Sequence, residues 1–161
     1  MYPRCLPNWI YLFVALIYNL GLAVWIGGTV VLGALVAPAL FRKMDRQEAG
    51  GLFGEILRKF SRIRLVCLGL VVASAAFKHF AWETHITGSS SPLWISIRWA
   101  AIAVMAAGIG YEVLFVERAM DRARNGGSDP AAKSLFSTLH LRAERLVKVE
   151  LIAAAIALLL N

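Results

Sequence analysis

The sequence predicts an all-α fold: a polytopic integral membrane four-helix bundle, with an interfacial amphipathic helix between spans one and two. Of the 161 residues, 59% are hydrophobic and only 17% are charged, which is too little polar material to cover a soluble globule. Residues 10–40 carry no formal charge and would extend about 46 Å as a helix, against a hydrocarbon core of roughly 30 Å. We therefore treat residues 1–161 as a single transmembrane domain.

The first predicted span covers residues 10–40, and Pro38 weakens or kinks its last turn. Between Met44 and Ser61 apolar residues recur at helical spacing, with charged residues largely around the other side. This pattern predicts either an interfacial helix on an anionic leaflet or a connector helix packed on the end of the bundle.

The next two spans are expected over residues 65–82 and 93–116. The first of them is just long enough to cross, with Lys78 reaching the far interface and Trp82 anchoring there. Span three begins with the interfacial residue Trp94.

A fourth span is expected over residues 142–160, because the purely apolar run 151–160 is too short to cross alone. The long side chains of Arg145 and Lys148 would then reach back to the interface.

The distribution of basic residues predicts the orientation. Segments 42–64 and 118–148 each contain seven Lys or Arg residues, fourteen of the seventeen in the chain. By the positive-inside rule, the connections 42–64 and 117–141 face the cytoplasm, which gives a multi-pass protein of the cell membrane with both termini outside. The basic residues flank apolar segments instead of forming one face, so the expected partner is the lipid bilayer and not nucleic acid.

Small residues predict where helices approach one another, because lipid provides little hydrophobic drive between helices. Several of them repeat at four-residue spacing, which indicates contacts within the bundle or between copies, with a pore or substrate lining as the alternative. The candidate packing residues are Gly27, Gly28, Thr29, Gly33, Ala37, Gly69, Ala73, Ala103, Ala107 and Gly110.

Polar residues inside spans are the functional candidates, because an ionised group in hydrocarbon costs at least ~2.5 kcal/mol on insertion scales. The candidates are Asn19, Glu112, Glu150 and His140. They would serve either as buried pairs that fix the register of the helices or in a proton, ion or ligand role. The expected partners of Glu112 across the bundle are Asn19, Tyr111, Lys148 and Arg145, unless its carboxyl stays protonated.

Metal-ligating residues gather in one place only. His79, Glu83 and His85 form a partial ligand set at the outer end of span two, with His79 and Glu83 four residues apart. The chain has no phosphate-binding loop, no Cys-x-x-Cys, no His-Glu-x-x-His and no nucleophile elbow. The sequence therefore predicts no enzymatic activity and no cofactor.

Three segments carry a family resemblance: Leu22-Ala23-Val24-Trp25-Ile26-Gly27-Gly28, Ala37-Pro38-Ala39-Leu40-Phe41-Arg42, and Ala49-Gly50 leading to Phe53-Gly54-Glu55-Ile56-Leu57. They resemble the opening pattern of the domain of unknown function 4149 family, which is similar to transmembrane protein 205. Leu139-His140 resembles that family's last-span entry. The resemblance implies a compact four-span membrane protein.

The tryptophan-glycine-glycine pattern also loosely resembles the copper-resistance protein D group, whose histidines within spans handle metal or haem. In this chain Tyr18 and Asn19 stand where such a histidine would lie.

The small-residue pattern leads to the functional hypothesis of a non-enzymatic four-span protein that acts through helix packing, as a homo-oligomer or as an accessory subunit of a larger membrane complex. The alternative is haem or copper binding, or proton-coupled transport.

Overall fold

The structure is a computed structural model, and it describes residues 7–83, 92–116, 118–119 and 130–161. The side chains of residues 46–47, 130–137 and 140 also lie outside the description. The described residues form α-helices and short π-helical turns (η) and include no strand. In chain order these are α1 (Asn8–Val31), η1 (Leu32–Val36), α2 (Ala37–Lys43), α3 (Arg46–Lys78), η2 (His79–Glu83), α5 (Leu93–Tyr111), η3 (Glu112–Val116) and α7 (Pro130–Leu159).

Three of the described helices are long and apolar enough to cross a membrane. They cover Asn8–Lys43, Glu48–Glu83 and Leu93–Val116, and each contains one of the first three predicted spans. The all-helical fold class predicted from the sequence is thus confirmed, and the length and apolar composition of these three helices agree with the predicted membrane character.

The amphipathic segment after the first span is not a separate interfacial helix. Only Met44 and Asp45 separate α2 from α3, which continues without interruption from Arg46 to Lys78. The start of α3 packs back on α2: Ala49 is fully buried, and the rings of Phe41 and Phe53 meet edge to face at 6.4 Å between centroids. This packing holds the segment in the bundle despite its three glycines.

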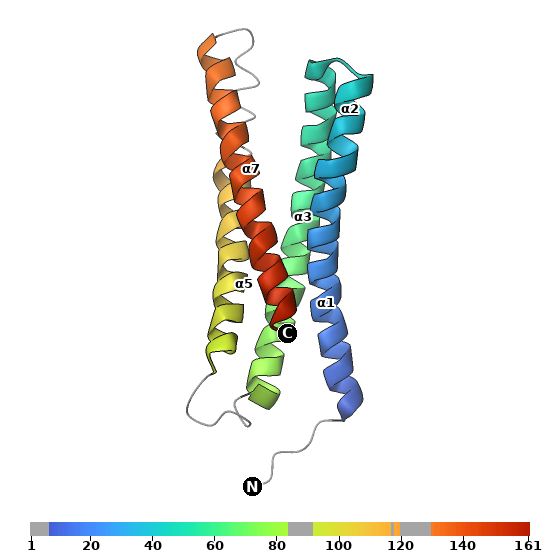
Figure 1. Ribbon diagram of the computed structural model, residues 1–161, viewed down its shortest axis with the longest axis vertical. Helices are drawn as coiled ribbons and strands as arrows, with labels where there is room; N and C mark the ends of the chain where they lie inside the picture. Colours follow the sequence, from blue (N-terminus) through green and yellow to red (C-terminus); the bar gives the residue numbers. More distant parts are fainter. Residues whose placement is uncertain (1–6, 84–91, 117, 120–129) are drawn as a thin grey trace.

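The helices form two antiparallel pairs, α1–α2 with α3 and α5 with α7 (Figure 1). The pairs diverge toward the end that carries the turn between α2 and α3, and α7 crosses toward α1 at its other end. The core between them is apolar, with Leu22, Trp25, Val71, Met105, Ile109 and Ala154 among its most buried members.

Three glycines allow helices to approach closely. A Cβ on Gly21 would press on Val71 and the Cys67 carbonyl, one on Gly28 would overlap the Phe60 ring, and one on Gly108 would overlap the Glu150 carboxylate. Of these, only Gly28 belongs to the candidate packing residues. Gly21 and Gly108 share helical faces with buried residues of α1 and α5.

The other candidate packing residues lie away from these contacts. A Cβ on Gly27, Gly33, Gly69 or Gly110 would meet no atom within 4 Å. Ala73, Ala103 and Ala107 are exposed, while Thr29 and Ala37 are half-buried. The hydroxyl of Thr29 donates to the carbonyl of Trp25 in its own helix. The exposed small residues thus make no close helix–helix contact within the chain, and contact between copies stays a prediction.

Candidate functional site

Two clusters of buried charged residues join α3–η2, α5–η3 and α7. The first, which we call the Arg64 cluster, consists of Arg64 on α3, Glu112 at the start of η3 and Glu150 on α7. The Arg64 guanidinium donates through Nη1 to Glu150 Oε2 at 2.7 Å and through Nη2 to Glu112 Oε2. One arginine thereby links three helices.

Aromatic rings and a hydroxyl complete the surroundings of Arg64. Its guanidinium carbon lies 5.4 Å from the ring centroid of Trp25 and 5.7 Å from that of Phe60, so it makes cation–π contacts with both. Nη2 also lies 3.5 Å from the Ser61 hydroxyl, one turn earlier on α3. The absence of a side chain at Gly108 leaves the space that the Glu150 carboxylate occupies.

The Arg64 cluster is unbalanced in charge and in hydrogen bonding. Two carboxylates face one guanidinium, and the side chains of Arg64 and Glu150 are only 3% and 1% exposed. Four buried polar atoms find no hydrogen-bond partner among the described residues, and three of them lie here: Glu150 Oε1, Arg64 Nε and Trp25 Nε1. The fourth is Arg98 Nε. Such atoms are uncommon in folded proteins and mark places where polarity has been retained at a cost.

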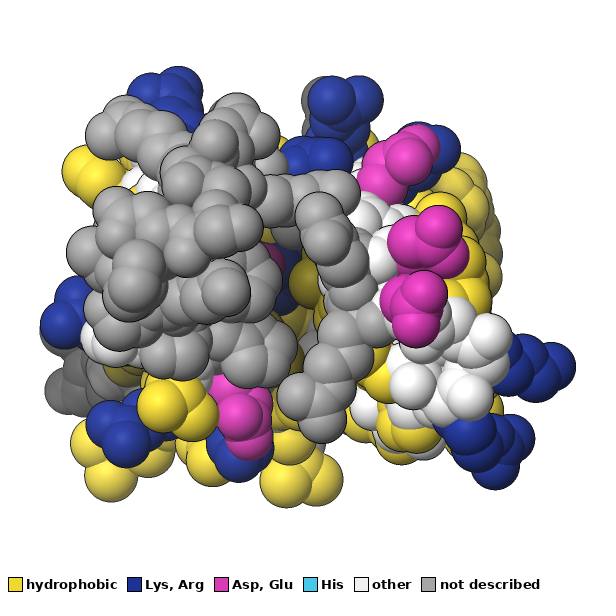
Figure 2. Space-filling view, turned by 90° about the horizontal axis from the view of Figure 1, so that it is seen from above, with side chains coloured by type: hydrophobic (Ala, Val, Ile, Leu, Met, Phe, Trp, Pro, Cys, Tyr) yellow, Lys and Arg dark blue, Asp and Glu magenta, His cyan; other side chains and the backbone are white. Residues whose placement is uncertain are grey.

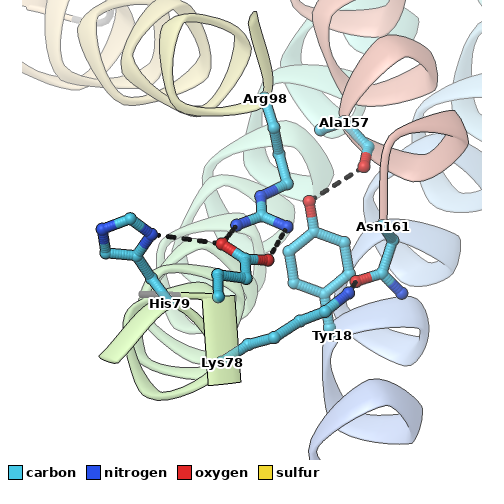
Figure 3. A network of polar contacts seen from close by, with 7 residues as sticks. Tyr18, Lys78, His79, Arg98, Ala157 and Asn161 are labelled. Atoms are coloured by element: carbon cyan, nitrogen blue, oxygen red, sulfur yellow. Dashed lines mark hydrogen bonds and ion pairs between the residues drawn. The ribbon is translucent and has the colours of Figure 1, made fainter. Parts of the chain in front are cut away.

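The second cluster, the Arg98 cluster, consists of Arg98 on α5 with Glu83 and His79 of η2 (Figure 3). Both terminal nitrogens of Arg98 donate to Glu83, one to each carboxylate oxygen, at a distance of 2.7 Å in both cases. This is the bidentate geometry of the strongest arginine–carboxylate pairs. His79 Nδ1 lies 3.1 Å from Glu83 Oε2. The guanidinium of Arg98 also stacks over the ring of Trp94 at 5.4 Å.

Hydrogen bonds next to the Arg98 cluster tie the end of α7 to α1 and α3. Tyr18 donates its hydroxyl to the Ala157 carbonyl at 2.9 Å, and Lys78 Nζ donates to Asn161 Oδ1 at 3.2 Å (Figure 3). The Asn161 amide nitrogen in turn donates to Asn19 Oδ1 at 2.9 Å. Asn19 is exposed on α1, and this hydrogen bond gives its side-chain oxygen a partner.

The two clusters lie at different depths. Arg98 and Glu112 belong to one continuous helical segment and are fourteen residues apart, which corresponds to about 21 Å along the axis. The apolar core, including Val71 and Met105, fills the layer between them.

Each cluster contains a carboxylate that lies in a π-helical turn. Glu83, which pairs with Arg98, lies in η2, and Glu112, which pairs with Arg64, lies in η3. Such turns occur mostly as single turns and frequently at functional sites.

The structure brings some candidate residues together and separates others. Glu112 and Glu150 meet on Arg64, whereas Asn19 contacts Asn161. The expected partners of Glu112 were wrong: for example, Lys148 is exposed and bonds to Glu144 at 2.7 Å, one turn away on α7.

Sequence reasoning missed both arginines as site residues, because Arg64 ends the predicted connection 42–64 and Arg98 lies near the start of the predicted span 93–116. Helical spacing could have found them. Arg64 continues the buried face of Cys67 and Val71, and Arg98 lies on the face of Ile95 and Met105.

The suggested metal ligands fall into two groups. His79 and Glu83 are close together, but both carboxylate oxygens of Glu83 are bound by Arg98. His85 lies outside the described residues, and so does the side chain of His140. Within the described part of the chain, no three His, Cys, Asp or Glu residues gather where they could hold a metal ion.

Comparison with known proteins identifies one family. The description "Domain of unknown function (DUF4149)" belongs to a family whose pattern matches residues 20–129, more than half of the chain. No curated protein and no solved structure matches the sequence. The family resemblance seen in the sequence is thereby confirmed, while the likeness to the copper-resistance protein D group stays a prediction.

Proposed function

The chain belongs to the DUF4149 family, and on that premise we propose that it is a non-enzymatic four-span protein of the cell membrane that acts through helix packing. Its first partner would be a second copy of the same chain, and its second an accessory position in a larger membrane complex. The observation that carries this proposal is a set of small residues on outward faces of the spans.

Two pairs of small residues at four-residue spacing lie on these outward faces. Gly69 and Ala73 are exposed on α3, and Ala103 and Ala107 are exposed on α5. A Cβ added to Gly69 would meet no atom within 4 Å. In a bilayer such pairs permit two backbones to approach closely, which is how helices associate where the hydrophobic effect gives little drive.

The packing of α7 supports its role as a fourth span. Ala153, Ala154 and Ala157 are buried against the other helices, and the Tyr18 hydroxyl bonds to the Ala157 carbonyl. The half of α7 that makes these contacts corresponds to the predicted span 142–160.

Aromatic residues support the proposed depth of the bundle. Trp82 and Trp94 lie at the same end as the Arg98 cluster, and the Trp82 ring meets Tyr11 edge to face at 5.3 Å between centroids. Tryptophan and tyrosine favour membrane interfaces. The seven basic residues of segment 42–64 and the seven of 118–148 favour the opposite end as the cytoplasmic one.

Energy transfer between labelled copies in liposomes tests the packing role. We expect transfer above the level of random encounters in the wild type, and a loss of at least several-fold when Gly69 and Ala73 are both changed to Leu. Ala155→Leu enlarges an exposed position of α7 outside these pairs and should leave the transfer unchanged. A signal that falls to the random level on dilution with lipid would refute self-association. The packing role would then require a second, different chain that co-purifies in stoichiometric amount.

The topology has its own test. Cysteines placed at the exposed positions Glu48 and Arg118 should both react with an impermeant thiol reagent only after the inner face is opened. Labelling of the two positions from different sides would contradict the four-span arrangement.

A second candidate function, proton-coupled transport, is favoured by the two carboxylates that meet on Arg64. Proton flux into liposomes should then fall in Glu112→Gln. Equal fluxes in the variant and the wild type would dismiss a transport role for this residue.

A further inference from the structure

The charges of the Arg64 cluster do not cancel. Arg64 contributes one positive charge from α3, whereas Glu112 from η3 and Glu150 from α7 can each contribute one negative charge. From α1 the neighbouring residue is the uncharged Trp25, and from α5 it is Gly108. Among the described residues, Arg64 is the only cation in contact with either carboxylate.

Burial makes this imbalance expensive. A buried charge is tolerated when it is paired and hydrogen-bonded, and two carboxylates that share one site resist ionising together. One bound proton would leave a single carboxylate opposite the single guanidinium. The cluster would then be neutral as a unit, and the proton belongs to the pair of carboxyl groups rather than to either one alone.

The hydrogen bonds indicate where that proton resides. An ionised carboxylate is an acceptor at both oxygens, but Glu150 receives a bond only at Oε2, while its buried Oε1 has no partner among the described residues. The residue is 1% exposed, so little water reaches it. Glu150 is therefore the member least suited to a negative charge.

The exposure of the side chains indicates how the proton is exchanged. The side chain of Glu112 is 11% exposed, compared with 3% for Arg64 and 1% for Glu150. The two helix pairs diverge toward the end with the turn between α2 and α3, and the view from that end shows a hollow between the pairs (Figure 2). Acidic and basic side chains are visible at depth in this hollow.

We propose that the Arg64 cluster is a binding site for one proton, held chiefly by Glu150 and exchanged with water through Glu112. On binding, a carboxyl O–H bond forms as an O–H bond of a hydronium ion breaks and leaves water, and on release the carboxyl O–H bond breaks and the proton returns to water. This role goes beyond helix packing, and it does not require that a proton cross the membrane.

Infrared spectroscopy of the full-length protein in lipid nanodiscs tests this site. The wild type at neutral pH should show the C=O band of one buried carboxylic acid per chain, and the band should shift in D₂O. It should disappear in both Glu112→Gln and Glu150→Gln, because either change leaves one carboxylate to balance Arg64. Glu55→Gln removes an exposed carboxylate paired with Lys59 and should retain the band.

The wild-type measurement decides the matter even if a variant does not fold. Absence of the band at every pH at which the wild type stays folded would overturn the proposal, and so would a band that persists in both folded Gln variants. Because the readout is a protonation state, it is independent of the self-association that energy transfer measures.

Discussion

The Arg98 cluster and the Arg64 cluster use the same chemical groups in different proportions. Arg98 meets one carboxylate, Glu83, through two bonds of 2.7 Å. Arg64 divides its two terminal nitrogens between Glu112 and Glu150. In the Arg98 pair the charges balance and both carboxylate oxygens of Glu83 accept a bond. In the Arg64 cluster there is one carboxyl group more than there are cations, and Glu150 Oε1 accepts no hydrogen bond from a described residue. A matched pair fastens helices, and an unmatched one can also respond to its surroundings.

Their neighbours differ in the same sense. Lys78 and His79 lie beside Glu83 and supply further positive or donor groups. Around Arg64 the neighbours are the rings of Trp25 and Phe60, which attract a cation, and the Ser61 hydroxyl. None of them is a second cation for the carboxylates. Removing the arginine should therefore be more damaging in the Arg64 cluster.

Arg64→Met should give the largest effect, because it leaves the two buried carboxyl groups of Glu112 and Glu150 without the guanidinium that both contact. We expect a loss of about 3–5 kcal/mol in the free energy of unfolding, measured by denaturant titration in mixed micelles. Arg62→Met, at an exposed position two residues earlier, should change it by less than about 0.5 kcal/mol. Equal stabilities for the two variants would remove the distinction between the clusters.

Arg98→Met should cost somewhat less, about 3 kcal/mol, because a single carboxylate is left and His79 and Lys78 remain close to it. The same titration measures it. Arg98→Lys keeps the charge but cannot make the two-pronged contact, so its loss should be intermediate. If Arg98→Met were more harmful than Arg64→Met, the matched pair would be the more important one.

Gly108→Ala tests the space that Glu150 needs. The added methyl would overlap the Glu150 carboxylate, and we expect a loss of about 1–3 kcal/mol. Gly27→Ala adds the same methyl where no atom lies within 4 Å, and it should stabilise α1 by about 0.5–1 kcal/mol. Thermal unfolding of both variants in one detergent gives the comparison, and a shift in the same direction would contradict it.

Tyr18→Phe should have the smallest effect, since it removes one neutral hydrogen bond next to the Arg98 cluster. The Ala157 carbonyl loses its side-chain donor, and we expect a loss of about 1 kcal/mol. Hydrogen exchange at the end of α7 should rise in this variant, while exchange around Glu150 should not. Increased exchange along the whole of α7 would mean that the two clusters do not act separately.

The sequence was sufficient to predict the helical class and three long apolar helices, because a long uncharged run such as residues 10–40 is typical of a membrane-crossing helix. It also singled out Glu112 and Glu150 by the cost of their burial. It could not supply their partner. A basic residue near the end of a span can be either an interfacial anchor or part of a buried ion pair. Which of the two it is depends on whether it lies on the face that the rest of its helix buries.

The small residues illustrate a second limit. Four-residue spacing identifies a stripe on a helix but not the neighbour that covers it. Gly28 faces Phe60, whereas Gly27, one position earlier, faces open space. A rotation of about 100° per residue separates a core contact from a lipid-facing position, and neighbouring spans rather than local spacing set that rotation.

The wide turns at η2 and η3 affect how the side chains of this bundle are aimed. A π-helical turn holds about one residue more than the α-helical turn that would take its place. Deleting one position from Glu112–Val116 would return that stretch to regular pitch and swing everything after it by about a quarter of a circle. Chains of different length at these two points would then carry the same spans with differently aimed acids.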